Sequence, residues 1–171
     1  DPDEYKKFCD GFNFSETPDQ ERAIKEVISD LISKKPQDRL ICGEVGFGKT
    51  EVALRASFIV AQSNYQVCIL APTTVLAKQH FEVFKDRFAD FPHKVCLLTR
   101  EQTNIEKEEI YNKINDNSYS IIIGTHALFN KEILFKNLNL LIIDEEHKFG
   151  VRQKELIRSL KNGINVISLS A

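Results

Sequence analysis

The sequence predicts a three-layer α/β domain, in which helices cover both faces of a mostly parallel sheet. Short and nearly continuous apolar runs alternate with amphipathic segments along the chain, as they do in domains built from successive strand and helix units. A glycine-rich loop at residues 43–50 joins one apolar run to the segment after it, and unusual polar residues follow the other runs. Because the carboxyl ends of parallel strands meet at one edge of a sheet, we expect these residues to share a ligand site.

Composition limits the class of protein. The 171 residues are 42% hydrophobic and 28% charged, as in ordinary globular domains, and no apolar run approaches the length of a membrane span. A net charge of −2 argues against a strongly basic protein that coats nucleic acid, but it is compatible with a few local phosphate contacts. The polar start shows no signal peptide and the chain contains no Met, so we expect an excised fragment of a larger, cytoplasmic protein without a membrane partner.

The cysteines indicate a reducing compartment. The four positions are Cys9, Cys42, Cys68 and Cys96. They are scattered, and three of them fall within apolar runs that have the pattern of buried strands. Neither the C-x-x-C spacing of a metal site nor a dense disulfide framework is present, so we expect reduced and packed thiols.

The chain begins with two expected parts. Residues 1–15 form a polar lead-in, whose three phenylalanines are expected to dock onto the rest, and residues 16–171 form the domain. The domain opens with a helix that has Thr17 as its N-cap and Pro18 at its first position. Apolar residues then recur at helical spacing until residues 34–36, Lys-Lys-Pro, end the helix.

Strands and helices alternate from there to the end of the chain. The helix after the second strand carries phenylalanines at spacings of three to five, which favours core packing over base stacking. Further helices are expected at about Asn104–Asn115, with a solvated charged face, and around Gln153–Leu160. The strands are expected at Leu40–Cys42, Val67–Leu70, Val95–Leu98, Ile121–Ile123, Leu140–Ile143 and Val166–Leu169.

The glycine-rich loop has the composition of a phosphate-binding loop. Glycines bring backbone N–H groups close to phosphates, and the N-terminus of the next helix adds positive potential. Lys49 can reach the β- and γ-phosphates, and the hydroxyl of Thr50 can coordinate Mg²⁺. A plain glycine turn between a strand and a helix is the alternative. The residues predicted to bind nucleotide are Gly43, Glu44, Val45, Gly46, Phe47, Gly48, Lys49 and Thr50.

A second segment supplies carboxylates. The apolar run Leu140–Ile143 ends at Asp144 and Glu145. Asp144 can hold Mg²⁺ through water, and Glu145 can orient or deprotonate an attacking water, as phosphoryl transfer to water requires. An acidic turn after a strand is the alternative for these residues alone. With the phosphate loop in the same chain, we predict Lys49, Asp144 and Glu145 as catalytic residues.

Six segments, which together cover most of the chain, match one family pattern. They are residues 16–20, 43–56, 71–80, 84–88, 123–128 and 144–155. These segments resemble the first RecA-like motor domain of superfamily-two helicases and translocases and, within that group, the family of bacterial transcription-repair coupling factors (Mfd). The RecG family of fork-remodelling helicases is also similar. RecG proteins usually have Gln where this chain has Glu146 and Glu where it has Thr74, so both positions favour the coupling factors.

The resemblance implies roles for single residues. Gln20 resembles the glutamine that reads adenine, which makes ATP the implied nucleotide beside Mg²⁺; alone, it would be an exposed residue of a first helical turn. His147 resembles the histidine that couples the nucleotide site to the DNA-contacting elements; alone, it would be a satisfied polar residue. Elements that contact the DNA backbone in this group match Thr73, Gln79, Thr99, Arg100, Gly124, Thr125 and His126.

By this resemblance the chain is the ATP-binding lobe of a DNA-dependent ATPase that translocates along double-stranded DNA. The parent protein would displace stalled RNA polymerase and recruit excision-repair proteins through modules outside these residues. A second RecA-like lobe with an arginine finger would also lie outside them, so the fragment is expected to be nearly inactive. A RecG-like fork-remodelling lobe, a nucleotide-regulated binding module without motor activity and a P-loop kinase are the alternatives.

Overall fold

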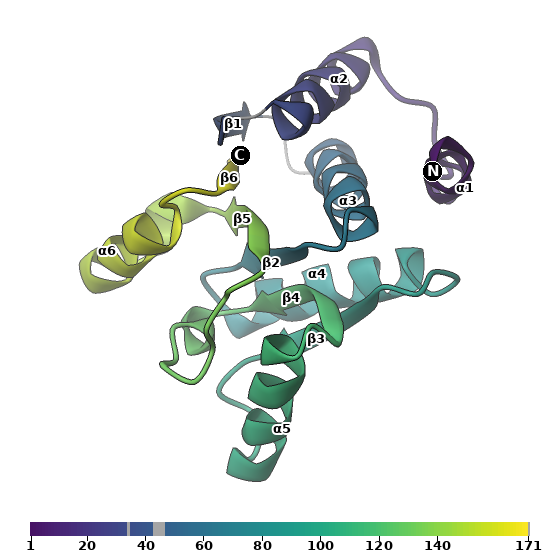
Figure 1. Cartoon of the computed structure of the whole chain (residues 1–171). Helices are drawn as coiled ribbons and strands as arrows, with labels where there is room; N and C mark the ends of the chain where they lie inside the picture. The colour runs from purple at the N-terminus through teal and green to yellow at the C-terminus, as the bar shows by residue number, and fades with distance from the viewer. Residues whose placement is uncertain (34, 43–46, 171) are drawn as a thin grey trace.

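Six parallel strands form one sheet that helices cover on both faces (Figure 1). The computed structural model describes residues 1–33, 35–42 and 47–170. Neighbouring strands are parallel throughout, in the order β1-β6-β5-β2-β4-β3. The strands are β1 Asp38–Cys42, β2 Gln66–Leu70, β3 Lys94–Leu98, β4 Tyr119–Gly124, β5 Leu138–Asp144 and β6 Asn165–Ser170. The predicted α/β class with a mostly parallel sheet is confirmed.

The helices divide between the two faces of the sheet. Buried side chains of α1 to α4 join one apolar cluster with one face, and those of α5 and α6 join a second cluster with the other. Short 3₁₀ turns follow β4 and β5, at His126–Leu128 and Glu146–Lys148. The helices are α1 Pro2–Cys9, α2 Pro18–Ile32, α3 Phe47–Gln62, α4 Thr74–Arg87, α5 Asn104–Asn115 and α6 Val151–Leu160. This is the three-layer arrangement that the sequence predicts.

The central strands are buried on both sides. In β2, Val67 and Ile69 belong to one apolar cluster, whereas Cys68 and Leu70 belong to the other, and all four are fully buried. Burial on both faces explains why the strand is a continuous apolar run and not an alternating one. Cys68 and Cys96 are buried free thiols, as expected.

The lead-in, residues 1–15, contains helix α1. Its N-cap is Asp1, whose Oδ1 accepts a hydrogen bond of 2.9 Å from the backbone N–H of Asp3. Phe8 is buried and stacks on Phe58 of α3, with 4.4 Å between the ring centroids. Docking through this phenylalanine was expected, but the helix was not. One buried aromatic residue in a short polar segment gives no helical periodicity to detect.

Most other helix ends lie where the local signals put them. Thr17 caps α2 and forms a capping box with Gln20, and α5 spans the predicted residues. Phe84 of α4 and Phe88, its C-cap residue, are buried in the core, so the core interpretation of the aromatic stripe is confirmed for them.

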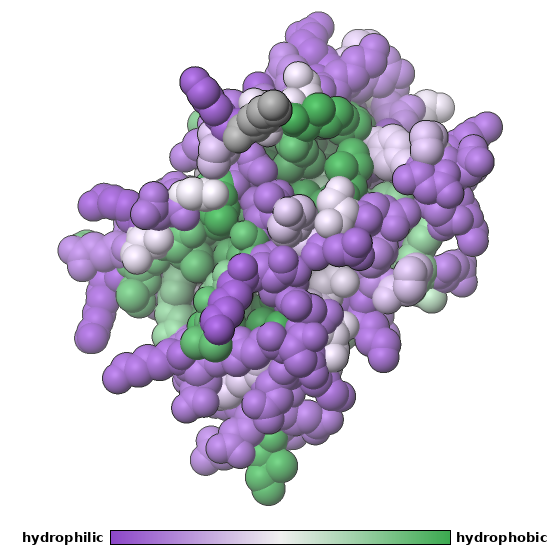
Figure 2. All heavy atoms as spheres, viewed as in Figure 1, coloured by the Kyte–Doolittle hydropathy of each residue, from purple (hydrophilic) through white to green (hydrophobic). Residues whose placement is uncertain are grey.

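None of the described helices is long and apolar enough to cross a membrane. Hydrophilic side chains cover most of the face in Figure 2, and apolar ones are exposed in separate patches.

Candidate active site

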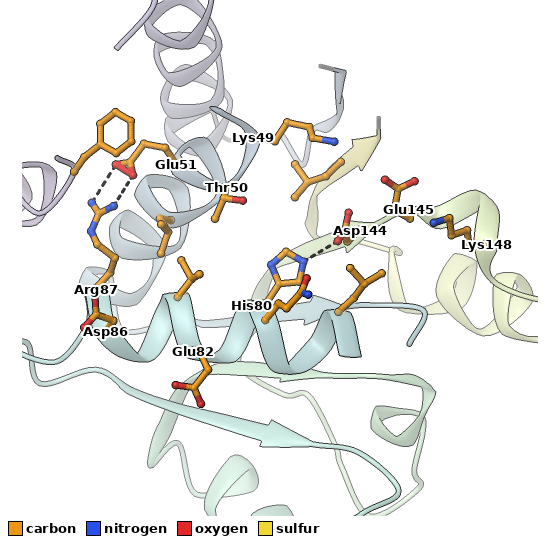
Figure 3. A pocket seen from close by; sticks show the side chains of 16 residues that line it. Lys49, Thr50, Glu51, His80, Glu82, Asp86, Arg87, Asp144, Glu145 and Lys148 are labelled. Carbon is orange, nitrogen blue, oxygen red and sulfur yellow. Dashed lines mark hydrogen bonds and ion pairs between the residues drawn. The ribbon is translucent and has the colours of Figure 1, made fainter. Parts of the chain in front are cut away.

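A cavity of about 850 Å³ opens at the carboxyl edge of the sheet, between α3 and α4 (Figure 3). Lys49 and Thr50, from the first turn of α3, line the cavity. Asp144, the last residue of β5, and Glu145, the next residue, line it as well. The strand order explains this meeting, because only β6 lies between β1, which precedes α3, and β5. Four residues from two distant segments, all predicted to act on nucleotide, thus face one cavity.

The N-terminus of α3 lies against the start of α2. Residues 43–46 of the predicted phosphate loop lie outside the described residues, and Phe47 begins α3. A Cβ added at Gly48 would lie 2.9 Å from Nε2 of Gln20, closer than ordinary packing allows. The absence of a side chain at Gly48 therefore leaves room for the amide of Gln20 beside the first turn of α3.

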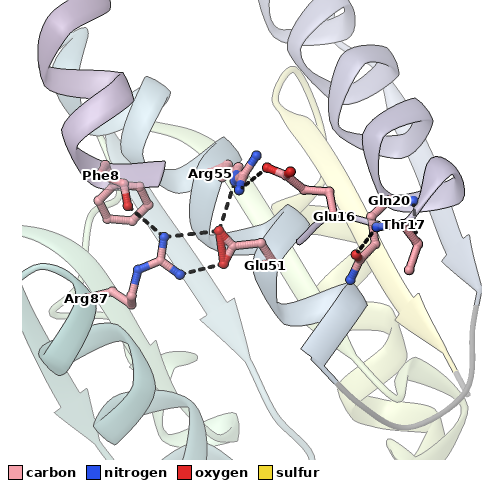
Figure 4. A network of polar contacts seen from close by, with 7 residues as sticks. All are labelled: Phe8, Glu16, Thr17, Gln20, Glu51, Arg55 and Arg87. Atoms are coloured by element: carbon pink, nitrogen blue, oxygen red, sulfur yellow. Dashed lines mark hydrogen bonds and ion pairs between the residues drawn. The ribbon is translucent and has the colours of Figure 1, made fainter. Parts of the chain in front are cut away.

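The amide of Gln20 is held in one orientation. Its Oε1 accepts a hydrogen bond of 2.8 Å from the backbone N–H of Thr17, and the backbone N–H of Gln20 donates to Thr17 Oγ1 at 3.1 Å. Since the oxygen must face the Thr17 N–H, the NH₂ group is the end that lies near Gly48. The capping box thus stabilises the helix and also orients a side chain proposed to contact the base (Figure 4).

The carboxylates follow a fully buried part of β5. Residues 140–143 are 0% exposed, and Asp144 Oδ2 lies at a hydrogen-bond distance of 2.8 Å from Nε2 of His80 on α4. Glu145 has left-handed backbone angles, φ 50° and ψ 53°, and its N–H donates to the carbonyl oxygen of Leu169 at 2.9 Å. The end of β6 therefore supports the turn that directs the carboxylate of Glu145 to the cavity.

The next two residues lie around this turn. Glu146 forms an ion pair of 3.0 Å with Lys161, at the end of α6. His147 is exposed, and its Nε2 lies 3.3 Å from Oε2 of Glu145. Glu146 is absent from the cavity lining, whereas Glu145 is part of it. Of the two glutamates, Glu145 is therefore the better placed to act on a ligand in the cavity.

The side chains at the cavity fit a magnesium ion. The hydroxyl of Thr50 and the carboxylate of Asp144 line the same space, and oxygen ligands of these two types are those that Mg²⁺ prefers. Among the described residues, no three His, Cys, Asp or Glu side chains gather into a metal site. An ion here would take its remaining ligands from water and phosphate, which is the usual mode of Mg²⁺ in nucleotide sites.

A buried network of charges lies beside the cavity (Figure 4). Glu51 accepts hydrogen bonds from Arg55 Nε at 2.9 Å and from Arg87 of α4 at 3.0 Å. Arg55 also pairs with Glu16 at 2.6 Å, and Arg87 donates to the carbonyl oxygen of Phe8 at 2.8 Å. Burial opposes the charge of Arg55, but the hydrogen bonds that its guanidinium donates to Glu51 and Glu16 outweigh this effect, so that its pKa is raised. Both arginines are thus committed to structural contacts.

The residues with a predicted DNA role lie at or just after the ends of the other strands, except Gln79, which lies on α4. Thr73 caps α4 by accepting a hydrogen bond of 3.2 Å from the N–H of Leu76, and the exposed Gln79 lies at the cavity rim. Arg100, after β3, and His126, after β4, are also exposed. These four side chains are accessible at the same edge of the sheet as the cavity.

The remaining three predicted DNA-contact residues are buried. Thr99 donates its N–H to Gln102 Oε1 at 2.7 Å, and Thr125 Oγ1 accepts from the N–H of Ala127 at 3.4 Å. A Cβ at Gly124 would lie 2.3 Å from the carbonyl oxygen of Leu98, so only glycine lets β3 and β4 approach so closely. Packing thus explains the glycine at position 124, and Thr99 and Thr125, at 0% and 3% exposure, offer almost no surface to DNA.

Sequence reasoning did not single out two features of the site. The contact between His80 and Asp144 joins residues 64 positions apart, and the network of Glu51, Arg55 and Arg87 uses charges within helices. A polar residue among the apolar positions of a helix was the available signal for Glu51. For His80 the signal was its place inside one of the family-like segments, residues 71–80.

A parallel sheet with a helix-borne lysine and threonine facing a strand-end acidic pair is the arrangement of a P-loop nucleotide-binding domain. A family model described as DEAD/DEAH box helicase matches residues 17–171, and the chain belongs to this family. Over 171 residues it is 45% identical to the transcription-repair-coupling factor of Escherichia coli and 50% identical to that of Haemophilus influenzae. The predicted resemblance to coupling factors is confirmed, and the chain is similar to their helicase motor domain.

The chain spans 15% of the length of each of these two relatives. It is also similar to a solved structure of RecG bound to a three-way DNA junction, with a TM-score of 0.86 and 34% sequence identity. That match covers 100% of this chain and 23% of the RecG chain. The RecA-like helicase fold expected from the motifs is therefore confirmed.

Proposed function

We propose that this chain is the ATP-binding lobe of a double-stranded DNA translocase of the coupling-factor type. The observation that carries the proposal is that Lys49, Thr50, Asp144 and Glu145 line one cavity at the carboxyl edge of the sheet. Membership of the DEAD/DEAH box helicase family supports ATP as the nucleotide. The whole protein would displace stalled RNA polymerase and couple to excision repair, since its similar relatives are named transcription-repair-coupling factors.

The nucleotide would lie across the N-terminus of α3. Lys49 would donate to the β- and γ-phosphate oxygens, while Gln20, with its NH₂ group beside Gly48, would contact the adenine. Thr50 and Asp144 would hold Mg²⁺, which neutralises charge that develops on the phosphates. The loop at residues 43–46 would complete the phosphate site with its backbone N–H groups.

Glu145 would take a proton from the attacking water. Its carboxylate lies at the cavity, and the hydrogen bond from its N–H to Leu169 fixes the turn that carries it. Glu146 is paired with Lys161 outside the cavity lining and is a poorer base for that reason. His147, next to Glu145, would pass changes at the nucleotide to the part of the domain that contacts DNA.

Double-stranded DNA would bind across the ends of β2, β4 and β3. The side chains of Thr73, Gln79, Arg100 and His126 are exposed at that edge and would contact the DNA backbone. Contacts of this kind position a strand without reading its sequence. Thr99, Gly124 and Thr125 are buried and would shape the turns that carry Arg100 and His126. With a net charge of −2, DNA binding by this lobe alone should be weak and should weaken further with salt.

Hydrolysis would need a second RecA-like lobe from the same protein. Arginine fingers are worth about 10³–10⁵ in rate, and Arg55 and Arg87 are unavailable because both pair with Glu51. The lobe alone should therefore hydrolyse ATP poorly. Bacterial relatives support a cytoplasmic site of action for the parent protein.

A RecG-like fork-remodelling helicase is the second candidate. The superposition on RecG favours it, but the identity of 34% is lower than the 45% and 50% shared with the two coupling factors. DNA translocation that removes a stalled polymerase, without preference for branched DNA, would distinguish the coupling-factor activity. A small-molecule kinase has no support from the family match.

The test is calorimetric titration of the chain with ATP or ADP in the presence of Mg²⁺. Lys49→Ala should weaken binding roughly 10- to 100-fold, because hydrogen bonds to charged groups are worth about 1.5–3 kcal/mol. Lys25→Ala removes an exposed lysine of α2 outside the cavity and should bind like the wild type. Equal affinities of wild type and Lys49→Ala would remove the basis of the proposed site.

A further inference from the structure

The contact between His80 and Asp144 joins the two halves of the sheet edge. His80 lies on α4, the helix that follows β2, and Asp144 ends β5, which pairs with β2. The distance from Nε2 to Oδ2 is 2.8 Å, and the two side chains are only 13% and 12% exposed. Figure 3 shows the imidazole directed from α4 at the carboxylate. Neither residue type is accounted for by packing alone, since both are polar and nearly buried.

The chemistry of the pair assigns a direction to the hydrogen bond. An ionised carboxylate can only accept, so Nε2 of His80 must carry the proton and donate it. One carboxylate oxygen, Oδ2, is thereby turned toward α4, and the other, Oδ1, stays outside this bond. Without the imidazole, the Asp144 side chain could rotate at the end of its strand, and its oxygens would not be fixed relative to Thr50.

We propose that His80 is a positioning residue for Asp144, which holds this carboxylate in the orientation that binds Mg²⁺ with the nucleotide. The inference rests on the proposed function, in which Asp144 and Thr50 hold the ion. Residues that hydrogen-bond to a metal ligand orient it, and their loss typically costs about 10- to 100-fold in metal affinity. His80 is thus a determinant of the Mg²⁺ affinity although it does not touch the ion.

The experiment measures nucleotide binding by the chain over a series of Mg²⁺ concentrations and takes the Mg²⁺ midpoint as its readout. His80→Gln keeps an amide NH₂ close to the place of Nε2, whereas the shorter His80→Asn cannot reach Asp144. The midpoint should rise about tenfold in His80→Asn and His80→Ala. It should stay within a factor of about three in His80→Gln. His93→Gln is the matched control, because His93 Nε2 lies 3.2 Å from Gln62 Oε1 and outside the cavity lining.

The outcomes separate this inference from the proposed function. If the wild type shows a Mg²⁺-dependent affinity and His80→Ala has the same midpoint, His80 does not position Asp144. Equal losses in the Gln, Asn and Ala variants would assign His80 a merely structural role and would also overturn the inference. If the wild type binds no nucleotide at any Mg²⁺ concentration, the proposed function itself fails. A tenfold shift that Gln rescues and Asn does not would support the inference.

Discussion

Glu51→Gln tests whether the buried charge network stabilises the fold. The side chain of Glu51 is 1% exposed and accepts hydrogen bonds from Arg55 and Arg87, whose side chains are 7% and 10% exposed. Glutamine has the same shape, but it has one acceptor oxygen in place of two and no charge. Its NH₂ group would face guanidinium donors, so that two buried positive charges lose their shared partner.

The magnitude follows from this loss. Breaking a buried ion pair by removing one partner typically costs about 3–5 kcal/mol. Domains are stable by only about 5–15 kcal/mol, so the substitution should remove a large part of the free energy of unfolding. Each kcal/mol shifts the midpoint of thermal unfolding by about 2–4 °C in a domain of this size. We therefore expect the midpoint to fall by about 6–20 °C.

Urea denaturation and thermal unfolding, both followed by circular dichroism, would measure this change. Glu82→Gln is the matched control, because Glu82 lies on α4 at the same cavity, is exposed and makes no ion pair among the described residues. Its midpoint should differ from that of the wild type by less than about 2 °C, as for most surface substitutions. A loss below about 1 kcal/mol in Glu51→Gln would refute the reasoning, since it would mean that water solvates the two arginines.

Two further predictions concern catalysis and the thiols. In the full-length protein, Glu145→Gln should keep nucleotide binding and lower ATP turnover by about 10²–10⁴-fold, because an amide can orient water but cannot take its proton. Near-normal turnover in steady-state assays would show that another residue is the base. Burial raises the pKa of Cys96 to about 12 and also raises that of Cys68, so neither thiol should react with an alkylating reagent at pH 8 until urea unfolds the chain. Mass spectrometry of the labelled protein would show this, and rapid native labelling of either cysteine would contradict the burial of β2 and β3.

The sequence predicts the local elements of this fold better than their contacts. The cap at Thr17 and the apolar run of β5 are signals within a few residues, and both give the correct element. Helix α1 is different, because its stability comes from packing of Phe8 against α3 and α4. Such tertiary contacts override a weak local pattern, and no window of sequence contains them.

The candidate site divides in the same way. A parallel sheet brings the strand ends to one edge, so the meeting of Lys49 with Asp144 follows from the fold class alone. The strand order does not follow from the periodicity, and it is the order that sets β5 beside β2 and thus His80 beside Asp144. For this reason, side-chain contacts that depend on the strand order could not be predicted from the sequence.

The backbone at Glu145 has a consequence for how this position tolerates change. Left-handed angles cost a residue with a side chain about 1–2 kcal/mol, and glycine avoids most of that cost. Glycine at position 145 would thus raise the free energy of unfolding of the domain without bound ligand, but it would remove the carboxylate from the cavity. Selection for thermal robustness alone would favour the loss of this glutamate, whereas selection for turnover would favour keeping it as the proposed catalytic base. Position 145 is therefore a place where these two selective pressures oppose each other, and a library screened only for folding should be depleted of the wild-type residue there.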